Sequence, residues 1–189
     1  MGIKSITYMN KAWLISGIPA SGKTATSKKL AESLNKSVYI SADELRTNNE
    51  VLPYINTEEE VKEYSEKVIR KQSNLAKSIL EKSITPILDE VVGRQELSLY
   101  KDYLEGYDLL FVTLNPPFHI VVERDNERSE EEKFDTKSNP LPNPKQWWEH
   151  LKQLILTVSD KGLWVDNSKM TIEETVSYIL QNKEKCLIK

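Results

Sequence analysis

The chain has 189 residues, of which 39% are hydrophobic and 29% are charged. This length and balance predict one soluble domain with a proper core over residues 1–189. The net charge of −3 gives no general attraction to nucleic acid, although it is compatible with a local basic cleft. The single cysteine, Cys186, excludes a disulfide framework and a cysteine-based metal site.

Targeting signals are missing from the sequence. No apolar run reaches the length of a membrane-spanning helix, and residues 1–10 lack the apolar core of a signal peptide. We therefore expect a cytoplasmic protein without a membrane partner. No motif indicates the oligomeric state.

Short apolar runs alternate with helical patterns along the chain. Strands are expected at 12–16, 38–40, 85–88, 109–114 and 163–165. Helices are expected at 25–34, at 57–82 behind a capping box of Thr57 and Glu60, around 97–104, at 116–128 behind Asn115, from Pro144, and at 171–181. The last of these is expected to be capped by Thr171 with Glu174. In the long second helix, the expected apolar stripe consists of Val61, Tyr64, Val68, Leu75 and Ile79. The alternation predicts an α/β fold whose parallel sheet carries helices on both faces.

The first strand leads directly into the pattern Gly-x-x-x-x-Gly-Lys-Thr, and a helix follows. This is the phosphate-binding P-loop in its proper context. The two glycines allow a tight turn whose N–H groups face phosphate oxygens, and the helix start adds its dipole. Lys23 is expected to bridge the β- and γ-phosphates of ATP, and Thr24 to bind Mg²⁺. The predicted ATP-binding residues are Gly17, Ile18, Pro19, Ala20, Ser21, Gly22, Lys23 and Thr24.

Two acidic residues follow neighbouring strands of the expected sheet, where ligands of such sheets bind. Asp43 is a candidate for the base that accepts a proton from an attacking hydroxyl group, and a helix cap is its structural alternative. Arg46, one helical turn later, suits an acceptor contact or a solvated charge. Asp89 suits the carboxylate that holds Mg²⁺ through water. Glu90 and Arg94 are candidate acceptor contacts or ordinary solvated side chains.

Arg124 and Arg128 are four residues apart and share one helix face before a polar, proline-containing loop at 129–142. We expect a mobile lid at about 124–143 whose two guanidinium groups neutralise charge on the transferring phosphoryl group. A surface ladder with neighbouring acidic residues is the alternative. Trp147 and Trp148 either pack against the core or lid or stack on the acceptor.

Four stretches together resemble the P-loop kinase superfamily: 17–24, 41–46, 87–93 and the arginine pair at 124 and 128. The nearest branch is that of the chloramphenicol-phosphotransferase-like, zeta-toxin-like and polynucleotide-kinase-like ATPases. The resemblance implies a three-layer P-loop NTPase fold with strand order 2-3-1-4-5, ATP with Mg²⁺, and phosphate transfer to a hydroxyl group. It matches Asp43 to the base and Arg46 to the substrate-clamping arginine of polynucleotide kinases. Residues 165–168 resemble the loop that borders adenine.

These patterns favour an ATP-dependent kinase, a single domain over residues 1–189 that phosphorylates a hydroxyl group of a small molecule by in-line transfer. A polynucleotide 5′-hydroxyl kinase is the alternative, and it would need a basic track for the strand backbone. A nucleic-acid partner is therefore compatible with the sequence but not favoured. An ATPase or a nucleotide-binding regulatory module is a further alternative. GTPase patterns are missing, because Asp89 begins Asp-x-x-x-Gly rather than Asp-x-x-Gly. No motif identifies the acceptor.

Removing the charge of Arg124 or Arg128 should lower kcat far more than ATP affinity, because the lid arginines are expected to act on charge that develops during transfer. Steady-state kinetics and ATP titration of Arg124→Gln and Arg128→Gln check this. An effect confined to ATP affinity would contradict the lid assignment.

Overall fold

The computed structural model describes residues 10–47, 58–127 and 144–188. Its sheet confirms the predicted fold class and strand order. All neighbouring strands are parallel, in the order β2-β3-β1-β4-β5. The strands are β1 (Lys11–Gly17), β2 (Ser37–Ser41), β3 (Thr85–Asp89), β4 (Asp108–Leu114) and β5 (Leu163–Val165).

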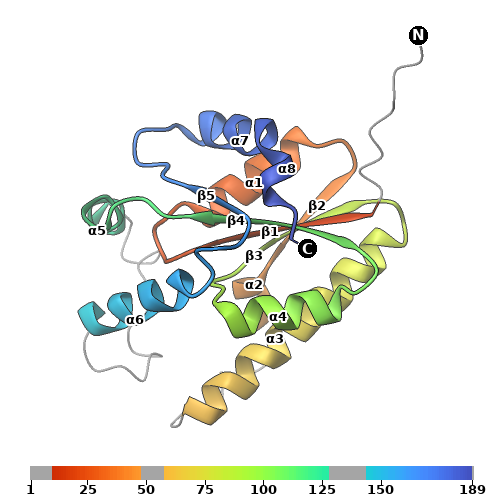
Figure 1. The fold of residues 1–189 in the computed structure, drawn as a ribbon, viewed down its shortest axis with the longest axis horizontal. Coiled ribbons are helices and arrows are strands. Elements are labelled where there is room, and N and C mark those ends of the chain that lie inside the picture. Colours follow the sequence, from red (N-terminus) through yellow and green to blue (C-terminus); the bar gives the residue numbers. More distant parts are fainter. Residues whose placement is uncertain (1–9, 48–57, 128–143, 189) are drawn as a thin grey trace.

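Helices cover both faces of the sheet, which gives three layers (Figure 1). The helices are α1 (Lys23–Ser33), α2 (Ala42–Thr47), α3 (Glu58–Leu80), α4 (Arg94–Tyr103), α5 (Phe118–Asn126), α6 (Pro144–Leu156), α7 (Ile172–Gln181) and α8 (Lys183–Cys186). On one face lie α1, α7 and α8, and on the other lie α3, α4 and α6. Within the described ranges, no helix combines the length and apolarity needed to cross a membrane.

Separate apolar clusters form the two interfaces between helices and sheet. On the α1 and α7 face, Trp13 packs with Ile179 and Cys186, all fully buried. Burial raises the pKa of the Cys186 thiol to about 12, so this residue behaves as a small core side chain. On the α3 and α4 face, Tyr100 and Phe111 are also fully buried.

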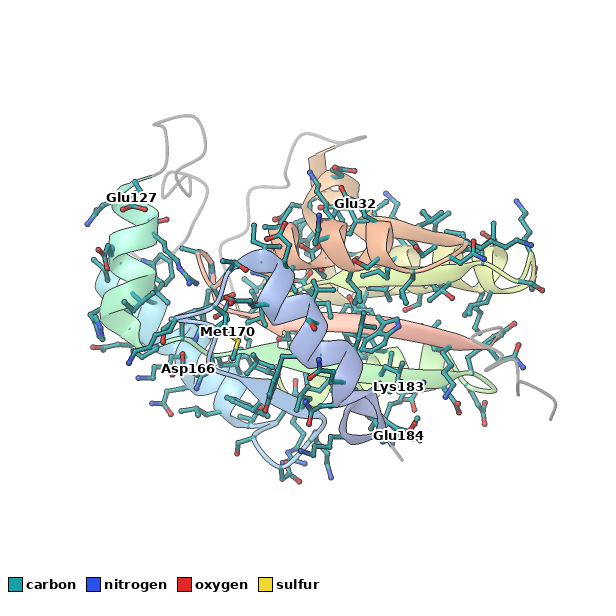
Figure 2. All side chains as sticks on the ribbon, turned by 90° about the horizontal axis from the view of Figure 1, so that it is seen from above. Glu32, Glu127, Asp166, Met170, Lys183 and Glu184 are labelled. Atoms are coloured by element: carbon teal, nitrogen blue, oxygen red, sulfur yellow. The ribbon has the colours of Figure 1, made fainter. Side chains whose placement is uncertain are left out.

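The strand register brings the loops that carry chemistry to one edge. Ser41, Asp89 and Ile15 lie side by side across β2, β3 and β1. The segments that follow these three residues therefore start at the same level, at the carboxyl ends of the strands. They carry the P-loop, Asp43 and Glu90. Figure 2 shows that α5, marked by Glu127, lies at this end with the loop after β5, whereas α8 lies at the other end of α7.

Several predicted helix details hold and others are wrong. The last helix has the predicted capping box, since Thr171 Oγ1 accepts from Glu174 N at 3.1 Å. The helix predicted from Pro116 begins instead at Phe118, with Pro117 as an extended N-cap. The reason is that a residue before proline avoids the α conformation, which excludes Pro116 from the helix. Arg128 and Thr57 lie outside the described residues.

The predicted apolar stripe of α3 holds only in part, since Val68 is buried and Ile79 packs against the core, whereas other members are exposed. Val61 and Leu75 are 40% and 41% exposed. The helix instead buries Ile69, Gln72 and Ser73 against the sheet, and two of these are polar. Apolarity alone therefore does not mark the side of this helix that faces the core.

Gly162→Ala should destabilise the fold more than Gly106→Ala. Both glycines have positive φ, 62° and 90°, so alanine costs about 1–2 kcal/mol of backbone strain at either site. A Cβ at Gly162 would also lie 2.3 Å from the backbone oxygen of Phe111, whereas the space around Gly106 is open. We expect an additional loss of about 1–3 kcal/mol in the free energy of unfolding, measured with urea. Equal losses would show that the close approach to β4 is unimportant.

Candidate active site

The P-loop, residues 17–24, joins β1 to α1 in a conformation that requires its glycines. Gly22 caps α1 with φ of 96°, in the left-handed region. Gly17 has φ of 149°, and a Cβ there would lie 2.6 Å from the backbone oxygen of Leu114. The loop therefore presents backbone N–H groups at a helix start, which is an anion site by geometry and dipole.

The lysine and threonine of the P-loop lie inside this site. Lys23 Nζ is 3.5 Å from the backbone oxygen of Ile18, within the loop itself. Thr24 Oγ1 donates a hydrogen bond of 3.0 Å to Asp89 Oδ2. Tyr39, on β2, donates a second hydrogen bond of 3.0 Å to the same oxygen. These hydrogen bonds thus join the start of α1 and the middle of β2 to the end of β3.

Asp89 is 4% exposed. Burial raises the pKa of its carboxyl, while Lys23 and the hydroxyl groups of Thr24 and Tyr39 oppose that shift. A carboxylate beside a threonine hydroxyl is a set of hard oxygen donors that fits Mg²⁺. Mg²⁺ in nucleotide sites usually has only one or two protein ligands, and the phosphates complete its shell. Within the described residues, no cluster of His, Cys, Asp and Glu side chains forms a cage by itself.

The acidic residues next to this pair are bridged by one arginine. Arg46 Nη1 donates to Asp43 Oδ1 at 2.7 Å, and Nη2 donates to Glu90 Oε2. Burial alone would lower the pKa of Arg46, but the two carboxylates hold this pKa above its ordinary value. Glu90 is 8% exposed and also accepts from the backbone N–H of Val91 at 2.7 Å. The structure therefore brings Asp43, Arg46 and Glu90 together beside Asp89.

The other candidate residues lie elsewhere or outside the described ranges. Arg94 is exposed, and its side chain pairs with Asp160 beyond α6 at 2.7 Å, not with the Asp43 group. Trp148 contacts Phe118 edge to face, with ring centroids 6.4 Å apart. The arrangement therefore connects Trp148 to the start of α5. Arg128 and the predicted lid loop are not described.

Arg124, on α5, contacts the P-loop and the loop after β5. Its guanidinium donates to the backbone oxygens of Ser21 at 3.4 Å and Asn167 at 2.9 Å. The side chain of Asn167, 5% exposed, also donates to the Ser21 oxygen at 3.0 Å. Sequence reasoning gave no role to Asn167, although its loop resembles the segment that borders adenine. It also missed Tyr39, because the partner of that residue lies on another strand.

The fold is shared with solved kinases. A sugar kinase from Janibacter sp. HTCC2649 aligns with 93% of this chain and 95% of its own, at a TM-score of 0.66 and 13% identity. Shikimate kinase from Aquifex aeolicus aligns over 96% of its length with 92% of this chain, at a TM-score of 0.60 and 22% identity. A chain of the Pnkp1/Rnl/Hen1 RNA repair complex aligns over 49% of its length with 84% of this chain, at a TM-score of 0.60 and 19% identity. The structure therefore has the P-loop NTPase fold that these proteins share.

The family follows from the sequence. A family model described as an AAA domain matches residues 14–139, a range that includes the P-loop, Asp43 and Asp89. The chain belongs to this AAA domain family. No match was found among curated protein sequences.

Tyr39→Phe should shift the acidic limb of Mg²⁺-dependent nucleotide binding to higher pH. Burial already raises the pKa of Asp89, and the Tyr39 hydrogen bond opposes that rise. Without the hydroxyl group, the carboxyl should protonate at a higher pH and lose its negative charge sooner as the pH falls. Titration of ATP in the presence of Mg²⁺ across pH 4–8 measures this shift. An unchanged or downward-shifted profile would contradict the role of Tyr39.

Proposed function

We propose that this protein transfers the γ-phosphoryl group of ATP to a hydroxyl group of a small molecule. One observation carries the proposal: the candidate metal ligand Asp89 ends β3, and the candidate base Asp43 follows the neighbouring β2, at the edge where the P-loop lies. This is the pair of acidic functions that phosphoryl transfer to an alcohol requires.

The nucleotide end of the site would hold the triphosphate. Backbone N–H groups of residues 17–24 and the ammonium group of Lys23 would bind the β- and γ-phosphates. Thr24 and Asp89 would hold Mg²⁺, which neutralises phosphate charge when bound with ATP. Arg124, which already contacts the P-loop, is proposed to approach the γ-phosphate from the other side. A lid at about 124–143 that also carries Arg128 remains part of this proposal.

At the acceptor end, Asp43 would take the proton of the attacking hydroxyl group. The acceptor oxygen forms a bond to the γ-phosphorus as the bond from phosphorus to the β–γ bridging oxygen breaks, and ADP leaves. The side chain of Asp43 is 84% exposed, so an acceptor can reach it. The Arg46 guanidinium fixes one of its oxygens at 2.7 Å and so orients the base.

The pairing of Arg46 supports an acceptor without an anionic group at this position. Both ends of its guanidinium are engaged by carboxylates, from Asp43 and Glu90. A phosphate group of a polynucleotide would have to displace one of them. Direct contact of Arg46, Glu90 or Arg94 with the acceptor stays a prediction.

The test is transfer of radiolabel from [γ-³²P]ATP to a pool of small hydroxylated metabolites and to oligonucleotides with 5′-hydroxyl ends. We expect label in a small molecule, and none with Lys23→Ala. Label in the oligonucleotide would favour the polynucleotide kinase. Phosphate released without an acceptor would favour an ATPase, and ATP binding without turnover a regulatory module.

Asp43→Asn should lower kcat by about 10²–10⁴-fold, because an amide cannot accept the proton. ATP affinity should change little, since the residue lies outside the P-loop. Glu44→Gln, which removes the adjacent exposed carboxylate on α2, is the matched control and should leave kcat near that of the wild type. Normal turnover of Asp43→Asn would refute the base assignment.

A further inference from the structure

A glutamine lies in the middle of the apolar interface between α3 and the sheet. Gln72 is completely buried, and its neighbours on the same helix face, Ile69 and Ala76, belong to the apolar core. An amide in such a place destabilises the fold unless its hydrogen bonds are satisfied. Its partners therefore indicate what it does.

The Gln72 amide connects two strands and a helix. Its Nε2 donates to the backbone oxygens of Ile40 on β2 at 2.8 Å and Asp89 on β3 at 3.3 Å. Its Oε1 accepts a hydrogen bond from the hydroxyl group of Tyr100 on α4, which is also fully buried. Because Tyr100 occupies the acceptor end, the donor end is held toward the strands.

These bonds lie where β2 and β3 end. The pairing of the two strands extends to Ser41 and Asp89, and Asp43 follows within the next turn of chain. The side chain of Asp89 is held by Thr24 and Tyr39. Gln72 instead holds the main chain from which this carboxylate projects.

We propose that Gln72, oriented by Tyr100, is a positioning residue that sets the separation between Asp43 and Asp89. We call Gln72 and Tyr100 the strand clamp. The proposal rests on the proposed function, in which Asp43 acts on the acceptor and Asp89 on the metal-bound phosphate. Transfer depends steeply on such a separation, since a displacement of about 1 Å can cost about 10²-fold in rate.

The test compares Gln72→Met with Ile69→Ala. Methionine retains most of the volume of glutamine but cannot bond to the two backbone oxygens. Ile69→Ala damages packing on the same helix face without touching a polar partner, and so controls for lost stability. We expect kcat of Gln72→Met to fall about tenfold or more, with KM for ATP within about threefold of the wild type. Ile69→Ala should lower Tm while retaining kcat.

Tyr100→Phe tests the orienting hydrogen bond. It should lower kcat less than Gln72→Met, because the amide retains its donors. In the double variant, kcat should fall no further than in Gln72→Met alone, since the two residues act as a unit. Additive losses would contradict a coupled clamp.

A readout without acceptor separates this proposal from the proposed function. Mn²⁺ titration of the complex with a non-hydrolysable ATP analogue, followed by electron paramagnetic resonance, reports on the metal site that includes Asp89. We expect weaker Mn²⁺ binding in Gln72→Met and unchanged binding in Ile69→Ala. If the wild type transfers phosphate to no acceptor, the proposed function fails and this titration still decides the clamp. Mn²⁺ binding and kcat equal to those of Ile69→Ala would overturn it.

Discussion

One buried carboxylate joins the phosphate loop to the sheet. Asp89 Oδ2 accepts hydrogen bonds from Thr24, at the start of α1, and from Tyr39 on β2. Burial disfavours its charge, and the two hydroxyl groups together with Lys23 compensate for this. Because Asp89 ends β3 and is bonded to α1 and β2, its carboxylate connects three different elements beside the P-loop.

The same edge solves a second electrostatic problem, that of holding several acids close together. Asp43 and Glu90 would repel each other and Asp89 if they were unpaired. Arg46 lies between the first two and bonds to both. One positive charge therefore lies between the carboxylates of Asp43 and Glu90. A bidentate guanidinium suits this task better than a lysine would.

The sequence predicts best what depends on neighbouring residues. The P-loop and the capping box at Thr171 follow from local patterns, whereas the strand order is what the family resemblance implies. The structure contains each of them. The start of α5 is missed because one proline excludes the residue before it from the helix. Gln72 is missed because its partners come from two strands and another helix. A polar residue with helical spacing gives no sign of such contacts.

Leu187 and Ile188 pair with a part of β4 that β5 leaves uncovered. The short β5 pairs with only the last part of β4, from Val112 to Leu114. Beyond it, Leu187 forms an antiparallel bridge with Leu110, and the N–H of Ile188 donates to the Leu109 oxygen at 3.0 Å. Without this segment, β4 would offer unpaired main-chain groups to other molecules, a known route to intermolecular strand association. Truncation at this end therefore carries a risk for solubility, quite apart from any effect on chemistry.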